Sequence, residues 1–234
     1  MNSVLTPPIR TAGRHAGRSR SGPKGQLGAS VRLALAGHRP GEQPNGGAVP
    51  ALAVLGRSNV GKSSLLNALL GVTVARVSQT PGRTQALYWY RVDEAFDLVD
   101  CPGYGFAKAP RDVRDRLEKL IEGFLSGTPR PEGALLLVDG RHGPQESDRS
   151  MALFLSNAGI PTVVVATKWD AVKPSARTRQ LRTLAEEFRR DDRPLLPVSS
   201  ETGENLHALV RLLRERVGAR PGGHVPSGAS AHPS

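Results

Sequence analysis

The sequence predicts an α/β fold in which a mainly parallel, six-stranded sheet has helices on both faces. Short apolar runs alternate with helical patterns across residues 48–218. Most of these runs are continuous, as expected of parallel strands that are buried on both faces. Two of the runs are separated only by Asp93 and Glu94, so they must form a hairpin, and one strand is therefore antiparallel.

The predicted strands and helices follow one another in a regular order. Strands are expected at residues 51–55, 86–92, 95–100, 134–139, 162–167 and 195–198. Helical patterns begin near Lys62, Asp112, Gln145, Ala176 and Glu204. Because strand–helix–strand connections are right-handed and short, this alternation gives one three-layer domain.

The segments that flank this pattern have a different composition. Residues 1–47 are rich in Gly, Ser, Pro, Ala and Arg, contain seven Lys and Arg residues, and have Glu42 as their only acid. They bury too little apolar surface to offset the entropy of ordering, so we predict a disordered basic arm, with a second disordered tail at 219–234. Such an arm favours a phosphate-rich partner; a solvated extension without a partner and an organelle transit peptide are the alternatives.

Bulk composition limits the class of protein. The chain has 234 residues and a formal net charge of +11, which fits one domain with tails. Its single cysteine, Cys101, excludes an intrachain disulfide, and no run of about 18 apolar residues marks a transmembrane helix. The N-terminus also lacks the apolar core of a signal peptide, so we expect a cytoplasmic protein with no membrane partner. We also expect a monomer.

A glycine-rich loop lies between the first predicted strand and the first predicted helix. Its pattern is G-x-x-x-x-G-K-S, formed by Gly56, Arg57, Ser58, Asn59, Val60, Gly61, Lys62 and Ser63. The glycines let backbone N–H groups point at an anion, and the helix N-terminus adds the positive end of its dipole. Lys62 would reach the β- and γ-phosphates of a nucleotide, and the Ser63 hydroxyl would bind Mg²⁺. A tight turn without a ligand is the alternative, which the strand–loop–helix context disfavours.

Two further segments carry groups suited to Mg²⁺ and the γ-phosphate. A D-x-x-G sequence ends one strand and consists of Asp100, Cys101, Pro102 and Gly103. Its aspartate would hold the ion through water, and its glycine N–H would meet the γ-phosphate. The loop at 80–85 can fold over the nucleotide and offer a threonine as a second protein ligand. Thr80 and Thr84 both qualify by chemistry, and spacing alone does not choose between them.

Two more motifs are placed to read a base. The first ends a strand and consists of Thr167, Lys168, Trp169 and Asp170. Its aspartate can accept from N1–H and the 2-amino group of guanine, whereas adenine would leave it unpaired, a mismatch that discriminates by about 10⁴. The aliphatic stem of Lys168 can lie along the base plane. The second motif, residues 199–203, is a weaker signal because Ser-rich loops are common helix caps. Its backbone N–H groups can contact the guanine oxygen. The expected nucleotide contacts here are Val198, Ser199 and Ser200.

In this order the motifs resemble those of the translation-factor-related GTPases, and their amino-acid sequences are similar to those of the EngB family. The similar segments are 56–67, 80–85, 100–108, 139–144 and 167–170. The resemblance implies a P-loop NTPase fold, with a GTP-binding G domain at 48–218. It also implies a GTPase implicated in assembly of the large ribosomal subunit. Finally, it favours Thr84 over Thr80 as the switch ligand of Mg²⁺, beside Ser63 and Asp100.

By the same resemblance, nucleotide contacts extend beyond the phosphate loop. The residues expected to act on the γ-phosphate are Lys62, Thr84 and Gly103. Further contacts are expected from Ser64, Gly82, Arg83, Gln85 and Ala86. The family's usual leucine after the switch aspartate is Cys101 here, and its packing role should survive because cysteine behaves as a small hydrophobe.

The position that many GTPases fill with a water-orienting glutamine is Tyr104 here. A phenol lacks the paired donor and acceptor of an amide, so we predict slow intrinsic hydrolysis that a partner or a cation stimulates. Asn59 suggests K⁺ as that cation, and a hydrogen bond within the loop is the alternative role. The expected partners are GTP, GDP and the large ribosomal subunit. The rival function is a GTP-gated scaffold that binds a protein in cell division and septation.

Overall fold

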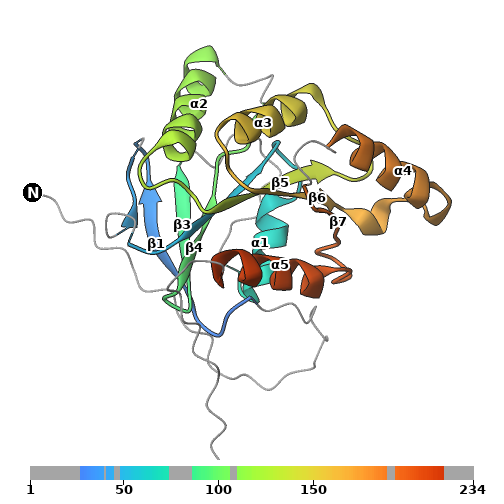
Figure 1. The fold of residues 1–234 in the computed structure, drawn as a ribbon, viewed down its shortest axis with the longest axis horizontal. Helices are drawn as coiled ribbons and strands as arrows, with labels where there is room; N and C mark the ends of the chain where they lie inside the picture. Colours follow the sequence, from blue (N-terminus) through green and yellow to red (C-terminus); the bar gives the residue numbers. More distant parts are fainter. Residues whose placement is uncertain are drawn as a thin grey trace, which may run out of the picture.

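The computed structural model describes residues 27–39, 41–44, 48–73, 86–105, 110–188 and 193–218. Within them, one sheet runs through the middle of the molecule and helices cover both of its faces (Figure 1). The strands are β1 (Val31–Gly37), β2 (Ala51–Gly56), β3 (Leu87–Val92), β4 (Phe96–Asp100), β5 (Gly133–Asp139), β6 (Thr162–Thr167) and β7 (Leu195–Pro197). The helices are α1 (Lys62–Leu70), α2 (Arg111–Ser126), α3 (Glu146–Asn157), α4 (Pro174–Glu187) and α5 (Leu206–Gly218), with a short 3₁₀ helix, η2 (Trp169–Ala171).

The sheet confirms the predicted fold class and has one strand more than expected. In the described part of the chain its order is β1-β3-β4-β2-β5-β6-β7. Strand β3 pairs antiparallel with both β1 and β4, and the other neighbouring strands are parallel. A single strand therefore runs against the rest, as the short link at Asp93 and Glu94 predicts. The other predicted elements begin within two residues of their expected positions.

Each face of the sheet carries its own apolar layer. Helices α2, α3 and α4 cover one face, where Phe124, Leu155 and Leu184 are buried against the strands. Helices α1 and α5 cover the other face, where Leu65 and Leu209 are buried. This two-sided burial explains the continuous apolar runs and brings the carboxyl ends of the parallel strands to one edge, where the predicted motifs lie. None of the helices described has the length and hydrophobicity needed to span a bilayer.

The prediction of a disordered arm over residues 1–47 is wrong for much of the part that the structure describes. Residues 31–37 form β1 at the edge of the sheet and pair with β3 from Val31↔Val92 to Gly37↔Leu87, with one register shift between Leu33 and Leu35. Residues 1–26, 40 and 45–47, and the predicted tail at 219–234, lie outside the described residues. The folded domain therefore begins before residue 48, and the predicted six strands become seven.

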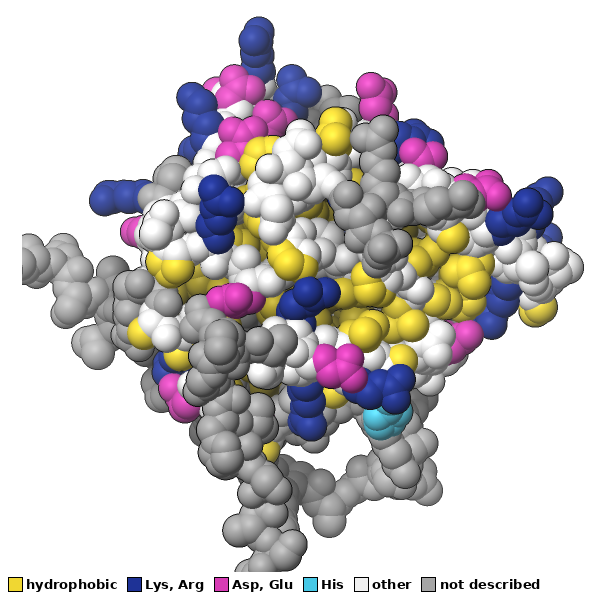
Figure 2. Space-filling model, viewed as in Figure 1, with side chains coloured by type: hydrophobic (Ala, Val, Ile, Leu, Met, Phe, Trp, Pro, Cys, Tyr) yellow, Lys and Arg dark blue, Asp and Glu magenta, His cyan; other side chains and the backbone are white. Residues whose placement is uncertain are grey.

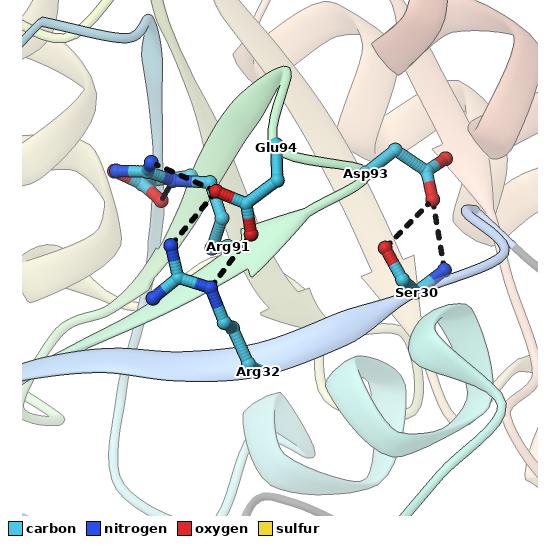
Figure 3. Close-up of polar contacts among 6 residues, drawn as sticks. Ser30, Arg32, Arg91, Asp93 and Glu94 are labelled. Atoms are coloured by element: carbon cyan, nitrogen blue, oxygen red, sulfur yellow. Dashed lines mark hydrogen bonds and ion pairs between the residues drawn. The ribbon is translucent and has the colours of Figure 1, made fainter.

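The turn between β3 and β4 explains why β1 forms despite its surrounding composition. Asp93 and Glu94 both adopt left-handed backbone conformations, with φ of 49° and 52°. The Asp93 carboxylate accepts the N–H groups of Ala29 and Ser30, each at 2.8 Å. Figure 3 shows its contacts with Ser30. Glu94 forms a two-point ion pair with Arg32 on β1. The partners that order this strand are therefore distant in the sequence, and local composition does not reveal them.

The segment before β1 is also fixed to the helices on the α1 face. Leu27 is buried, and its N–H donates to the Leu69 carbonyl at 2.7 Å. The Arg214 guanidinium of α5 donates to the Leu27 carbonyl at 3.0 Å. The described chain therefore enters the fold beside the carboxyl end of α1, away from the phosphate loop at the other end of that helix.

We expect Asp93→Ala to lower the free energy of unfolding by about 1–2 kcal/mol. The change removes an acceptor of two N–H groups and places alanine at positive φ. Asp93→Asn should lose less than half as much, because asparagine tolerates this conformation and keeps an accepting oxygen. Urea unfolding followed by tryptophan fluorescence measures both variants. Equal losses would show that the turn carboxylate does not act through these bonds.

Candidate functional site

The phosphate loop joins the carboxyl end of β2 to the first turn of α1. Asn59 and Gly61 have φ of 61° and 109°, so the backbone curls between Gly56 and Lys62. Gly61 is the N-cap residue of α1, and no side chain caps the helix. The first N–H groups of α1 are therefore left for an anion, which is the arrangement that the sequence motif predicts.

Two charged groups are buried at this loop, Lys62 and Asp100. Lys62 is 9 % exposed, and its ammonium donates to the Gly56 carbonyl at 3.3 Å. Burial lowers the pKa of Lys62, and the nearby Asp100 carboxylate opposes that change. Asp100 is 3 % exposed, and burial raises its pKa to about 6 against the opposing effect of Lys62. Both groups lack full solvation, so an anion beside Lys62 and a cation beside Asp100 would stabilise them.

The Asp100 carboxylate fits a role in holding Mg²⁺. Its Oδ1 atom is buried and has no hydrogen-bond partner among the residues that the structure describes, which is uncommon for a buried polar atom. The parallel register Val54↔Asp100 places it beside the end of β2, and Ser63 lies in the first turn of the helix that follows. Carboxylate and hydroxyl oxygens are ligands that suit this ion.

The structure describes some of the other residues that were predicted to contact the nucleotide. Ser64 lies in the first turn of α1, Ala86 is buried immediately before β3, and Ser200 follows β7. Cys101 and Pro102 are buried beside Asp100. Four predicted residues of the switch loop lie outside the described residues: Gly82, Arg83, Thr84 and Gln85.

The segment after Asp100 lies against the phosphate loop. A Cβ atom on Gly103 would come within 3.0 Å of the Ser58 nitrogen and 3.1 Å of Lys62 Nζ, so a larger residue would crowd the loop. The Tyr104 N–H donates to the Gly56 carbonyl at 3.3 Å, and the Tyr104 carbonyl accepts from the Ser58 N–H at 3.1 Å. The D-x-x-G backbone is thus held beside Lys62, as expected of a group that contacts the γ-phosphate.

The Tyr104 side chain turns away from this loop and enters the core. It is buried, and its hydroxyl donates to Asp148 Oδ1 at 3.0 Å. Asp148 Oδ2 accepts the Gln145 N–H at 2.9 Å and completes the capping box of α3. Burial raises the pKa of both Tyr104 and Asp148. The phenol is therefore engaged by α3 rather than positioned to orient water, and no local sequence pattern signals a contact across 44 residues.

The base motif at the end of β6 contacts the phosphate loop directly. The Thr167 hydroxyl donates to the Val60 carbonyl at 2.6 Å. Lys168 Nζ donates to the Asn59 carbonyl at 2.5 Å and to Asp139 Oδ2 at 3.0 Å. Sequence reasoning assigned Lys168 only a stem along the base, and the structure adds an anchor for its ammonium. The role of Asp139 was missed, although its place at the end of a parallel strand is a usable signal.

Asp170 and the loop after β7 lie together, as the base-reading hypothesis requires. The Asp170 carboxylate accepts the Ser199 hydroxyl at 2.6 Å. Ser199 Oγ in turn accepts the Thr202 N–H at 3.1 Å. The Trp169 N–H donates to the Val198 carbonyl at 3.3 Å. The loops after β6 and β7 are therefore joined into one rim, which the Lys168 anchor connects to the phosphate loop.

The fold and this site define the class of protein: a P-loop GTP-binding protein, with the phosphate loop on β2 and α1 and the base motifs after β6 and β7. Residues 51–168 match the family described as 50S ribosome-binding GTPases, and residues 119–218 match the elongation factor Tu GTP-binding domain. Within this class the chain belongs to the EngB family of GTP-binding proteins.

Bacterial relatives are similar over most of the chain. The probable EngB of Limosilactobacillus fermentum is 42 % identical over 173 residues, which are 73 % of this chain and 88 % of that protein. The probable EngB of Thermotoga petrophila is 40 % identical over 188 residues, or 78 % and 94 % of the two chains. A crystal structure of a probable EngB has a TM-score of 0.61 and 29 % identity, and covers 73 % of this chain and 100 % of its own. Era in complex with MgGDPNP and a 16S ribosomal RNA segment has a TM-score of 0.59, covers 79 % and 59 %, and at 24 % identity shows a shared fold.

We expect the stabilisation that Asp139 provides to be lost in acid. Burial raises the pKa of Asp139, but hydrogen bonds from Arg141 and Lys168 outweigh this effect and lower the pKa to about 2. An unfolded aspartate titrates near pH ~3.9. The contribution, about 2 kcal/mol, is therefore present above that pH and is lost as the pH falls towards 2.

Urea unfolding of Asp139→Asn and the parent protein at pH 7 and pH 3 tests this expectation. The variant should be the less stable at pH 7, and the difference should shrink at pH 3. Glu122→Gln, at an exposed position of α2, is the control and should change stability little at pH 7. A loss in Asp139→Asn that is the same at both pH values would refute the assignment.

Proposed function

We propose that this protein is a GTP- and Mg²⁺-dependent switch that hydrolyses GTP slowly and acts in assembly of the large ribosomal subunit. The match of residues 51–168 to 50S ribosome-binding GTPases is the observation that carries this proposal. The phosphate loop and membership of the EngB family support GTP binding and hydrolysis. The proposal includes the ribosomal partner and the slow rate of GTP hydrolysis. It also includes that the protein is cytoplasmic and monomeric.

The chain's own residues would bind and orient the nucleotide. The phosphate-loop N–H groups and Lys62 would hold the phosphates, and the Gly103 N–H would face the γ-phosphate. Ser63, Thr84 and Asp100 would hold Mg²⁺, which neutralises phosphate charge when bound. Contacts to the γ-phosphate would order the loops at 76–86 and 103–112, and loss of that phosphate would release them.

The environment of Tyr104 supports the proposal of slow intrinsic hydrolysis. Its phenol is buried and bonded to Asp148, so it does not occupy the place from which a glutamine amide orients water. A group from outside the chain would have to complete the site. The ribosomal subunit or a cation bound there would therefore set the rate of turnover.

Positive charge would supply the salt-sensitive part of binding to ribosomal RNA. Residues 1–26 contain five Lys and Arg residues and no acid. On the face shown in Figure 2, by contrast, Lys and Arg side chains lie among Asp and Glu side chains. We propose that these N-terminal residues contribute affinity for RNA phosphates that is independent of nucleotide.

Co-sedimentation with purified ribosomal subunits tests the proposed function. We expect large subunits to retain the protein several-fold better with GTP or a non-hydrolysable analogue than with GDP, because switch contacts form only with the γ-phosphate. A chain that begins at residue 27 should bind more weakly, with a shallower salt dependence, and keep the nucleotide effect. Truncation at residue 48 is unsuitable because it removes β1. Retention that ignores the nucleotide would overturn the switch, and selective capture of a cell-division protein would favour the scaffold.

We expect K⁺ to accelerate turnover on the large subunit several-fold over Na⁺ at equal ionic strength. Asn59 is exposed in the phosphate loop, and its side chain makes no hydrogen bond among the described residues, which leaves its amide oxygen for a cation. A cation there would offset charge that develops on the phosphates. Phosphate release measured in KCl and NaCl gives the ratio, and Asn59→Ala should remove the difference. Equal rates in both salts for the parent protein would exclude this role.

A further inference from the structure

The two loops that read the base in the proposed function come from different strands, β6 and β7. The hydrogen bond between Asp170 and Ser199 joins these loops, and Arg177 connects them a second time. We propose that Arg177, in α4, is a positioning residue for guanine recognition that fixes these two loops relative to each other. This inference rests on the proposed base-reading role of Asp170.

The Arg177 guanidinium contacts both loops. Its Nη2 donates to the Trp169 carbonyl at 3.1 Å, and its Nε donates to the Val172 carbonyl at 3.3 Å. Its Nη1 donates to the Glu204 carboxylate at 3.1 Å, in the loop between β7 and α5. The side chains of Arg177 and Glu204 are 32 % and 34 % exposed, so surrounding residues partly shield this ion pair from water.

These contacts hold the Asp170–Ser199 bond at both of its ends. The carbonyls of Trp169 and Val172 flank Asp170 in the chain, so the guanidinium fixes the η2 turn on both sides of the carboxylate. On the other loop, the Glu204 carbonyl accepts the Ser199 N–H at 3.1 Å. One cationic side chain therefore connects to the backbone on either side of Asp170 and to the residue that holds Ser199.

Arginine suits this place better than lysine. The three acceptors belong to three different residues, and a planar guanidinium can donate to all of them at once in a fixed geometry. Its Cζ atom also lies 5.8 Å from the centroid of the Trp169 ring. That ring packs on the end of β5, because a Cβ atom on Gly140 would come within 3.0 Å of it. The turn that carries Asp170 is thus held between α4 and the sheet.

A second arginine of the same helix provides a matched control. Arg182 is 82 % exposed and pairs with Glu186, four residues further along α4. This pair lies within one helix and joins no loops. Loss of its charge should therefore leave base recognition unchanged.

Binding of GDP and inosine diphosphate, measured by displacement of a fluorescent GDP, tests the proposal. Inosine diphosphate lacks the 2-amino group from which Asp170 would accept, so the ratio of the two affinities reports the position of that carboxylate. We expect Arg177→Met to weaken GDP binding about tenfold and to bring the ratio several-fold closer to one. Arg182→Met should keep the parent values. Glu204→Gln, which keeps an accepting oxygen, should lose less than Glu204→Ala.

The possible results separate this inference from the proposed function. If Arg177→Met is folded by its melting temperature and keeps the parent ratio within about twofold, the positioning role is overturned. Asp170→Asn should prefer xanthosine diphosphate to GDP, and unchanged GDP affinity in that variant would refute base reading whatever Arg177 does. Should Arg177→Met fail to fold, Arg177→Lys keeps the charge and the stem and is expected to lower the ratio in the same direction. An unchanged ratio in that variant would then overturn the role.

Discussion

The site depends on keeping two opposite charges out of water: Lys62, at the start of α1, and Asp100, at the end of β4. Burial lowers the pKa of Lys62 and raises that of Asp100, which favours the neutral form of each group, and their mutual attraction opposes both shifts. Such a pair recovers only part of its lost hydration by itself. The helices on both faces of the sheet exclude the water, and the parallel register Val54↔Asp100 sets where the carboxylate lies. The fold therefore holds the two charges in a state that a phosphate and a divalent cation would complete.

Features that depend on neighbouring residues were predictable from the sequence, and those that depend on distant contacts were not. Strands buried on both faces appear as apolar runs, and the turn at Asp93 and Glu94 dictates a hairpin. The strand β1 has a half-exposed pattern within Gly-rich surroundings, so its composition suggested disorder. It is ordered because Arg32 pairs with Glu94, 62 residues further along the chain. The Asp93 carboxylate also accepts the N–H group of Ala29, just before the strand.

The same distinction applies inside the site. Both base-reading motifs follow predicted strands and were expected to contact the same base, and the structure brings Asp170 to Ser199 in the loop that follows β7. The bond from the Lys168 ammonium to the Asn59 carbonyl spans 109 residues, and only the folded sheet brings these atoms together. For Tyr104, its identity indicated the missing glutamine, whereas the destination of the phenol depends on how α3 packs. Residue type thus predicts which chemistry is available, and topology decides which partner receives it.

The two ends of the site differ in how they are held. At the base end, side chains connect three loops to one another, and none of these bonds depends on a phosphate. At the phosphate end, the backbone of Gly103 and Tyr104 lies directly against the loop, so a group bound beside Lys62 would lie next to this segment. Because the Tyr104 phenol is bonded to the capping box of α3, displacement of its backbone would strain that bond and the start of the helix. Recognition of the base and response to the γ-phosphate would therefore depend on different sets of bonds, so the second could change while the first remained.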